Sequence, residues 1–423
     1  MAIPELRVLE GSNSTIRIAF QQDVPVTPRV LRLIDSPHFQ RLKQIPQLGF
    51  VRSVYPSATH TRFEHSLGVY HLALRYIRHF QANDSFSRLI PEHELELFIL
   101  AALLHDIGHW PYCHPMEDMG LADIPHHEHT AAHALRSELI ANLLVDDWDT
   151  SPTSLIAFLA GETSSPGQFF LYQLLSSPID IDKLDYLQRD SLHAGVPYGR
   201  NFDSNRLING LRICPESHRL MISNKAQTAA EMMVFARYVM FSEVYWHRTV
   251  RSATAMLQRL IYELRDSSEL IHSVINSTET QCQLLLLQAD KTHLAEFLFG
   301  RQRRLYKAVF ETNAAADKEL YQLAGVLDYP GLVKTSTKLA EILDIPAEGL
   351  LIDAAPQTLE VQFDIEVLTD KSNERQTLSS VSPVVRALAT EQFDHHVKRL
   401  RIFVAPQHQE KQITRQQLMD AFH

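Results

Sequence analysis

Cysteine is scarce in this sequence, and its three cysteines stand apart from one another. Cys113, Cys214 and Cys282 form no CxxC pair, which argues against a disulfide framework or a thiolate zinc site and indicates a reducing compartment. Long apolar runs are missing too, because the longest, from Leu97 to Leu104, is far too short to span a membrane. The first residues lack the charged segment and apolar core of a signal peptide, so we expect a cytoplasmic protein without a membrane partner.

An excess of positive charge is also missing. The 40 lysines and arginines are outnumbered by 50 aspartates and glutamates, and the formal net charge is −10. This balance argues against a broad surface for long nucleic acid, although a local basic pocket can still hold a small anion. With 423 residues, of which 45% are hydrophobic, the chain can form one large globular core with an appendage.

Apolar periodicity predicts a mainly α-helical protein that ends in a small α+β subdomain. We divide the chain into an N-terminal lead-in at 1–26, a helical core at 27–330 and a C-terminal subdomain at 331–423. In the core, helices are expected near 63–80, 91–106, 128–147, 152–161, 179–193 and 226–265. In the tail, alternating residues predict a strand at 359–367, a hairpin turn at Asp370–Asn373 and a last strand at 398–404.

Histidine, in contrast, is abundant, and half of the 22 histidines lie between His60 and His129. His105 and Asp106 follow the apolar run directly, and Gly108 then turns the chain. Imidazole and carboxylate groups together suit divalent metals, and an unpaired charge beside the core would be costly. We therefore interpret this pair as metal ligands, against the alternative of a histidine that only stabilises a helix C-terminus.

The expected helix at 179–193 carries a second set of candidate residues. A step of 100° per residue places Asp182, Lys183, Tyr186 and Asp190 in one arc, opposite an apolar stripe. The arc is either a solvated face or part of a site that supplies a metal ligand, a phosphate-binding cation and groups for a sugar. The helix alone leaves both interpretations open. Further on, Arg237 lies among apolar residues, which is consistent with a buried arginine that faces an anion.

Taken in order, these motifs resemble those of the HD-domain deoxynucleoside triphosphate triphosphohydrolases, the group that contains the vertebrate SAM-and-HD-domain protein and smaller bacterial relatives. The motifs are Arg62-Phe63-Glu64-His65-Ser66-Leu67-Gly68, His105-Asp106-Ile107-Gly108-His109, His127-Glu128 and Ile181-Asp182-Lys183-Leu184-Asp185-Tyr186. The resemblance starts near Ile34 and extends, with gaps, to the end of the chain. It implies an HD-domain helical core with one divalent ion (Mn, Fe, Zn, Ni or Mg), and an additional Mg²⁺ with the nucleotide is a further option.

The resemblance also implies a role for each matching position. The metal ligands would be His65, His105, Asp106 and Asp182. The active-site histidines would be His109, His114 and His127, with Glu117 and Glu128 orienting them. The triphosphate would be held by Arg62, Lys183 and Arg237, the deoxyribose by Gln47, Leu48, Tyr186 and Asp190, and the base by Tyr245 and His247. Histidine ligands need acceptors for their second nitrogen, and Glu64 and Glu128 are available.

The reaction that the resemblance implies converts a deoxynucleoside triphosphate to a deoxynucleoside and inorganic triphosphate. Two alternatives stay open. The same metal core could cleave another phosphorylated substrate, such as a ribonucleotide, an alarmone, a cyclic dinucleotide or single-stranded nucleic acid. The chain could instead be a nucleotide-sensing oligomer or scaffold with a vestigial site, although all four ligand positions are filled.

Regulation and assembly are less well determined by the motifs. Relatives commonly carry an Asp-Pro-Ile-His-Gly run that helps to form a regulatory nucleotide pocket, and residues 20–26 stand in its place here. Asp35, Gln40 and Lys43 still match regulatory positions, so a nucleotide activator stays an open option. Because the lead-in is short, we expect no SAM domain before the helical core. A homo-oligomer, either a dimer or a tetramer, is expected from the resemblance alone.

Overall fold

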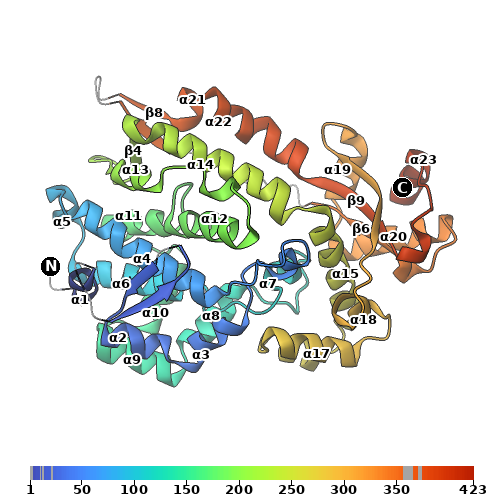
Figure 1. Cartoon of the computed structure of the whole chain (residues 1–423), viewed down its shortest axis with the longest axis horizontal. Coiled ribbons are helices and arrows are strands. Elements are labelled where there is room, and N and C mark those ends of the chain that lie inside the picture. The colour runs from blue at the N-terminus through green and yellow to red at the C-terminus, as the bar shows by residue number, and fades with distance from the viewer. Residues whose placement is uncertain (1–2, 10, 12–13, 21, 356–364, 370–373) are drawn as a thin grey trace.

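The computed structural model describes residues 3–9, 11, 14–20, 22–355, 365–369 and 374–423, and these residues are mainly α-helical (Figure 1). The expected fold class is therefore confirmed. The strand expected at 359–367 lies mostly outside the described residues, and the turn expected at Asp370–Asn373 lies wholly outside them.

The centre of the larger body is formed by α4 (Arg62–Phe80), α6 (Glu92–Leu104) and α12 (Ile181–Ala194), and α4 packs against the other two. From Leu97 to Leu104 every side chain of α6 is buried, so this helix is enclosed on all sides. Around the three helices lie α2 (Pro28–Ile34), α3 (Pro37–Arg41), α8 (His127–Leu135), α9 (Glu138–Trp148), α10 (Pro152–Leu159) and α11 (Pro166–Leu175).

Side-chain caps fix where several of these helices begin. Thr27, Ser36 and Asp180 each accept a hydrogen bond from a backbone N–H of the first turn that follows. Proline follows the first two caps directly, where its missing N–H costs nothing. Gly195 ends α12 with φ +71°, a left-handed conformation that glycine adopts readily.

Two expected helices are interrupted. The helix expected at 128–147 consists of α8 and α9, which are separated at Arg136 and Ser137. The helix expected at 226–265 consists of α14 (Gln227–Met240), a π turn at Phe241–Tyr245 and α15 (Arg248–Leu264). His247 caps α15, since its Nδ1 accepts from the backbone N–H of Thr249 at 3.2 Å. Apolar residues continue through both breaks, so periodicity alone did not reveal them.

The C-terminal residues contribute to two sheets. In the smaller body, β9 (Arg399–Val404) lies between β5 (Lys307–Asn313) and β6 (Leu350–Asp353) and pairs antiparallel with both. A separate hydrophobic cluster joins this sheet to α19 (Lys318–Gly325), α20 (Tyr329–Ile342) and α23 (Arg415–Phe422), at the right of Figure 1. The other sheet has the order β3 (Leu211–Ile213), β4 (Leu220–Ser223), β7 (Glu366–Leu368) and β8 (Arg375–Thr377).

The tail thus runs back along the helical core. The strand β7 pairs parallel with β4 and antiparallel with β8, as expected for a hairpin. After it come α21 (Leu378–Val381), α22 (Pro383–Ala387), which packs on α14, and a π-helical stretch, Leu388–Val397, that leads to β9 (Figure 1). The proposed domain boundary at 331 therefore stays a prediction, since α20 begins at Tyr329 and the tail contacts both bodies.

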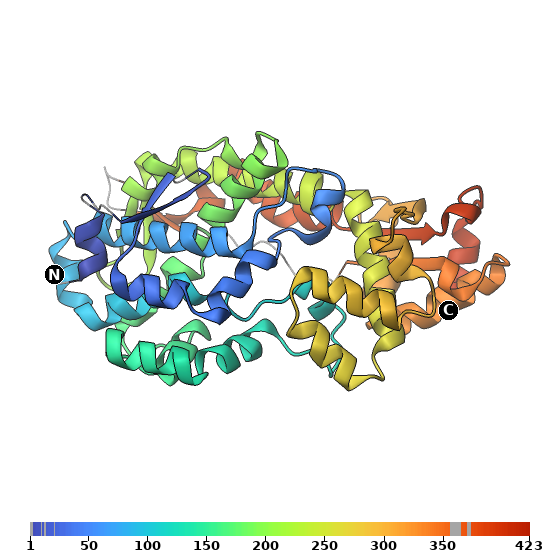
Figure 2. The same cartoon turned by 60° about the horizontal axis from the view of Figure 1, so that its bottom comes forward.

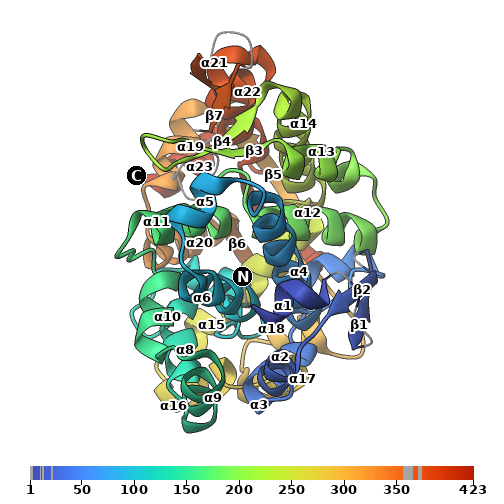
Figure 3. The ribbon, with the colours of Figure 1, turned by 90° about the vertical axis from the view of Figure 1, so that its left-hand side faces the viewer.

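The remaining elements lie at the edges of the larger body. The N-terminal hairpin of β1 (Thr15–Ile18) and β2 (Gln22–Pro25) rests on α4, beside α1 (Pro4–Val8) (Figure 3). Next to α3 lie α16 (Ser268–Ile275), α17 (Glu279–Ala289) and α18 (Leu294–Phe299), drawn in gold in Figure 2. Shorter helices are α5 (Asp84–Leu89), α7 (Cys113–Glu117) and α13 (Ser204–Asn209). Among the described residues, no helix combines the length and the apolar composition needed to cross a bilayer.

Candidate active site

Three helix ends bring the candidate metal ligands together. His65 lies in the first turn of α4, His105 directly follows α6, and Asp182 lies in the first turn of α12. Nε2 of His65 is 3.3 Å from Nε2 of His105 and 3.0 Å from Oδ1 of Asp182. The carboxylate of Asp106 lies 3.9 Å from the first ring and 3.6 Å from the second. Each of the two carboxylates therefore lies within 4.0 Å of both rings.

The second nitrogen of each ring is already bound on the far side. Nδ1 of His65 is 2.8 Å from Oδ2 of Asp185, and Nδ1 of His105 is 3.0 Å from the carbonyl oxygen of Ala102. Burial lowers the pKa of His65, but hydrogen bonds to Asp182 and Asp185 raise it to a net value of about 10, so a metal ion would displace a proton from its Nε2. Each acceptor fixes a proton on Nδ1 and so leaves Nε2 as the atom that would face the ion. This tautomer is the one that a histidine ligand requires. One oxygen or nitrogen from each of His65, His105 and Asp182 lies within 4.8 Å of the others, so the group can hold a metal ion.

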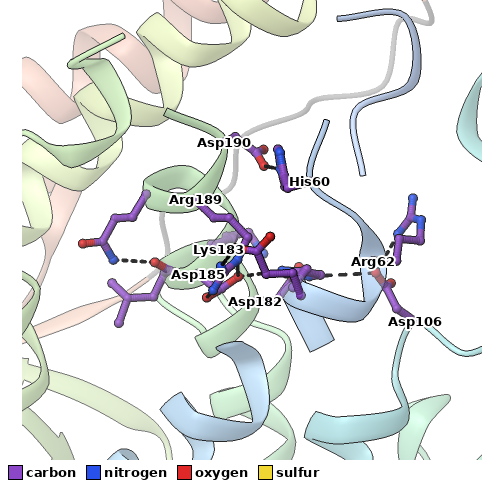
Figure 4. A network of polar contacts seen from close by, with 12 residues as sticks. His60, Arg62, Asp106, Asp182, Lys183, Asp185, Arg189 and Asp190 are labelled. Carbon is purple, nitrogen blue, oxygen red and sulfur yellow. Dashed lines mark hydrogen bonds and ion pairs between the residues drawn. The ribbon is translucent and has the colours of Figure 1, made fainter. Parts of the chain in front are cut away.

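Behind the first ring, Asp185 is itself held in place. Arg189 donates to its two oxygens at 2.8 and 2.7 Å and also to Glu64 at 2.6 Å (Figure 4). The arginine lowers the pKa of Asp185 against the opposing effect of burial, so the carboxylate stays charged. The acceptor of His65 is therefore Asp185, whereas the expected candidate Glu64 binds Arg189 and His193 instead.

Arg62 lies directly beside the candidate metal ligands. Its Nη1 donates to Oδ2 of Asp106 at 2.7 Å, and both side chains are buried (Figure 4). Burial raises the pKa of Asp106, but Arg62 and the nearby histidines lower it more, and the net pKa is well below its usual value. Asp106 is therefore an anion at neutral pH, and the guanidinium beside it keeps further N–H donors.

A cluster of three histidines and one glutamate forms the next wall. The rings of His109 and His127 are 4.0 Å apart between centroids, and those of His109 and His114 are 5.0 Å apart. Glu117 accepts from Nδ1 of His127 at 2.9 Å, from its backbone N–H at 2.6 Å and from Nδ1 of His114 at 3.2 Å. Burial lowers the pKa of His127, yet the hydrogen bond to Glu117 outweighs it and the net pKa is raised. Burial and Arg62 lower the pKa of His109, which stays neutral.

A cavity of about 740 Å³ contains most of these groups. The candidate residues on its wall are Gln47, Arg62, His65, His105, Asp106, His109, His114, His127, Glu128, Asp182 and Tyr186. Its other walls are largely apolar and come from α8, α10 and α11, where Leu135, Ile156, Leu159 and Leu175 line it. A polar, charged end thus opens into an apolar compartment.

Candidate residues that do not line this cavity are Leu48, Glu117, Lys183, Asp190, Arg237, Tyr245 and His247. The ammonium of Lys183 is 2.6 Å from Oδ2 of Asp180, which also caps α12. Asp190 accepts from Nε2 of His60 and from the hydroxyl of Tyr245, both at 2.7 Å (Figure 4 shows the first pair). The arc of α12 is therefore neither a solvated face nor one continuous wall of the cavity.

Sequence reasoning missed several groups that support the site. Asp185 and Arg189 hold His65, Asp180 holds Lys183, and His60 holds Asp190. The spacing of Asp185 and Arg189, four residues apart on one helix, was a usable signal for an ion pair. No sequence signal pointed to the carbonyl oxygen of Ala102, because every residue carries one.

Comparison with known families agrees with this geometry. A model of the HD domain matches residues 62–162, and a model of the HD associated region matches residues 202–423. The chain belongs to the HD-domain family. HD domains are metal-dependent phosphohydrolase domains, so the family places this HD protein among the phosphohydrolases of that superfamily. His65, His105 and Asp106 fall within the matched HD segment, and Asp182 lies between the two matched segments.

Individual relatives are distant but extensive. The HD protein is 29% identical to the uncharacterized protein MJ1154 of Methanocaldococcus jannaschii over 381 residues, which are 88% of this chain and 75% of that protein. It is also 29% identical to deoxynucleoside triphosphate triphosphohydrolase SAMHD1 of Homo sapiens over 384 residues. This alignment covers 78% of this chain but only 60% of the human protein. A solved structure of a hypothetical protein from Aquifex aeolicus matches with a TM-score of 0.74 and 26% identity, and covers 97% of this chain and 100% of its own.

Proposed function

We propose that this HD protein is a metal-dependent dNTP triphosphohydrolase, which converts a deoxynucleoside triphosphate to a deoxynucleoside and inorganic triphosphate. The observation that carries the proposal is the pair of His65 and His105, whose Nε2 atoms face one point while both Nδ1 atoms are bound elsewhere. The name of the human relative, which contains the matched region, supports dNTPs as the substrate class.

The ion would be held by His65, His105, Asp106 and Asp182. Two imidazoles and two carboxylates suit Mn²⁺, Fe²⁺, Zn²⁺ or Ni²⁺ and can also bind Mg²⁺. A divalent ion in this position supplies Lewis-acid activation of a phosphate ester and of water. The carboxylates are ionised already, since the pKa values of Asp106 and Asp182 are both lowered against the opposing effect of burial.

In the proposed reaction, a water oxygen bonds to the α-phosphorus and the bond from that phosphorus to the 5′-oxygen breaks. The water oxygen leaves with the triphosphate, and the 5′-oxygen takes up a proton. His114 or His127 would deliver that proton. Both line the cavity and both donate to Glu117 through Nδ1, so Nε2 is the atom that would carry it. The raised pKa of His127 keeps it protonated closer to neutral pH.

Charge on the triphosphate would be neutralised by Arg62, whose guanidinium lines the cavity. Lys183 and Arg237 would contribute from behind this wall. Burial raises the pKa of Tyr186 while Arg237 and Lys183 lower it, so both cations lie within electrostatic range of a residue on the wall. Lys183 would have to exchange its bond to Asp180 for a phosphate oxygen as the substrate enters.

The sugar would be read by Gln47 and Tyr186. Both line the cavity, and the amide oxygen of Gln47 is buried without a hydrogen-bond partner, so it is an acceptor prepared for a ligand donor. Leu48 and the Asp190–Tyr245 pair would support this wall, and Tyr245 and His247 would flank the base. We further propose a cytoplasmic homo-oligomer, a dimer or a tetramer, with a nucleotide activator as an additional option.

The deciding experiment is a substrate panel with products resolved by anion-exchange chromatography. The purified protein is incubated with dNTPs, NTPs, an alarmone and cyclic dinucleotides, each with Mg²⁺ or Mn²⁺. We expect intact triphosphate from dNTPs and slower release from NTPs. Pyrophosphate or orthophosphate as the first product, or turnover of cyclic dinucleotides alone, would replace the proposed reaction with another HD phosphohydrolase activity. No turnover with any substrate and metal would favour a vestigial site.

A further inference from the structure

A second cavity, of about 830 Å³, lies on the other side of the segment that carries His105 and Asp106. Its walls come from α3, the turn at Ile107 and Gly108, α8 and α16, elements that lie together in the lower part of Figure 3. Figure 2 shows the gold helices α16–α18 next to the blue α3 region. None of the residues assigned to catalysis, substrate or metal lines this cavity, so it needs an explanation of its own.

Arg41 is the decisive residue on its wall. Its guanidinium donates to the carbonyl oxygens of His109 at 2.8 Å, Ile275 at 2.9 Å and Ser277 at 3.1 Å, and its Nε is buried without an acceptor. Burial lowers the pKa of Arg41 to about 10. In the part of the chain that the structure describes, no carboxylate lies within ion-pair distance of it.

Arg41 is partly buried, and the fully buried arginines among the described residues are paired with carboxylates. Arg62 faces Asp106 at 2.7 Å, and Arg189 faces Asp185 at 2.7 Å. A buried cation without a counter-ion is costly, because carbonyl oxygens supply only part of the charge that an anion would supply. Arg41 is thus a half-satisfied cation at the edge of a cavity, which is the arrangement expected where an anion binds from outside the chain.

Histidines add further ring nitrogens to the wall, each of which can bind an oxyanion through a hydrogen bond. His38, His133 and His272 line the cavity together with Arg41, and Nδ1 of His38 is buried without a partner. Burial lowers the pKa of His38, and the charges of Arg41 and His133 lower it further, which places the three groups close to one another. Asp123 is the acidic residue on the wall, and it carries one charge against these donors.

The rest of the wall is apolar and includes Ile107, Ile271 and Ile275. We propose that this cavity binds an organic oxyanion, with a phosphate or carboxylate head at Arg41, His38 and His133 and an apolar or aromatic body against the isoleucines. We name this cavity the Arg41 site. The volume accommodates a small metabolite rather than a macromolecule.

The Arg41 site shares a wall with the candidate active site. Arg41 holds the carbonyl oxygen of His109, and Thr130 donates to that of Gly108 at 2.6 Å. The helix α8 turns His127 and Ala131 toward the active-site cavity and Thr130 and His133 toward the Arg41 site. A ligand that orders this wall would therefore change the positions of His109 and His127, and binding would be coupled to turnover.

The test measures binding alone, so that it can fail independently of the proposed function. Phenyl phosphate and benzoate are titrated by calorimetry into the wild-type protein, His133→Glu and the matched control His93→Glu. His133 and His93 are both exposed, and each substitution brings a negative charge, but His93 lies at the start of α6, outside both cavities. We expect His133→Glu to weaken binding at least tenfold, His93→Glu to leave it unchanged and His133→Lys to retain it.

Arg62→Lys separates the two cavities. Loss of binding in this variant with retention in His133→Glu would place the probe in the active site and overturn the proposal, as would the absence of binding by either probe. Tighter binding of phenyl phosphate than of benzoate would identify a phosphate as the ligand head, and the reverse order would identify a carboxylate. Arg41→Gln is expected to abolish binding. If it fails to fold, the histidine variants still decide the result.

Discussion

Asp185 lies behind His65, with its Oδ2 2.8 Å from Nδ1 of the ring, on the side away from His105 and Asp182. The same carboxylate receives two hydrogen bonds from Arg189. The ring orientation that a metal ion would require is thus set by a residue that would not face the ion, and this arrangement allows orientation to be separated from ligation by mutation.

Asp185→Asn is expected to lower metal affinity about 10–100-fold, because the amide no longer fixes the tautomer and angle of His65. It should also destabilise the fold by about 3–5 kcal/mol, since Arg189 loses a buried partner. Metal content by mass spectrometry and thermal unfolding measure the two effects. Glu64→Gln is the matched control, because it also removes a carboxylate from Arg189 but does not touch His65. Equal metal loss in both variants would assign the effect to Arg189.

His105→Ala should remove turnover of dNTPs while leaving most of the fold intact. The ring is only partly buried, and its sole backbone bond is to Ala102. We expect a fall in kcat of about 10³-fold or more, as for loss of a group that acts in the transition state, with a change in melting temperature of a few degrees. Wild-type activity in a metal-loaded variant would refute the metal site at this position.

Arg62→Ala should reduce both turnover and stability. Asp106 would be left as an unpaired buried anion, at a cost of about 3–5 kcal/mol. Arg62→Lys keeps the charge but not the fork of donors, so it should recover most of the melting temperature and little of kcat/KM. Full recovery of kcat/KM by lysine would show that only charge is needed here.

Glu117→Gln should move the pH dependence of turnover. Glu117 raises the pKa of His127 against the effect of burial, so its removal lowers that pKa. A proton donor works only when protonated, and activity falls as the pH rises through its pKa. The alkaline limb of kcat should therefore shift to lower pH. By linkage, protonated His127 stabilises the fold below about pH 6.5, its unfolded pKa, and this stabilisation is lost as the pH rises through the folded pKa. An unmoved alkaline limb would assign the proton to another group.

Gly108→Ala should disturb the wall between the two cavities. A Cβ at this position would lie 2.2 Å from the carbonyl oxygen of His127 and 2.3 Å from the backbone nitrogen of Ala131, so α8 must move. We expect a destabilisation of about 1–3 kcal/mol and a loss of activity. Gly120→Ala is the control: φ is +62° and a Cβ there meets nothing within 4 Å, so it should cost about 1 kcal/mol and leave activity unchanged. Normal activity in Gly108→Ala would show that His127 need not be held tightly.

The helical character of the fold was predictable, because apolar periodicity marks the helices. The close approach of His65, His105, Asp106 and Asp182 was expected from the family motifs, which lie at helix ends. Asp185 was not predicted, although a helical step places it beside Asp182. The functional residues of α12 were expected only in the arc that contains Asp182, and Asp185 lies next to this arc. Asp180 lies three residues before Lys183, a spacing that could have indicated this pair, whereas the pairing of Asp190 with His60 joins segments far apart in the sequence. Sequence spacing constrains such distances only within one helix.

The breaks in the helices were beyond local patterns for a different reason. Arg136 and Ser137 interrupt α8 and α9 without a glycine or proline, so tertiary packing decides the end of the helix. The Arg41 site could not be predicted from the sequence either, because its donors come from three separate helices, α3, α8 and α16. Arg41 differs from the buried arginines only in that no carboxylate of the described residues pairs with it.

The π turn at Phe241–Tyr245 allows a change in chain length beside the site. Such a turn holds one residue more than an α-helical turn, so shortening this stretch by one residue would let α14 continue as a regular helix. Because the deleted residue is the one that the wider turn absorbs, the side chains that follow would keep their angular positions around the helix axis. The same deletion within α12 would instead rotate every later side chain of that helix by about 100° and would move Asp190 away from His60 and Tyr245.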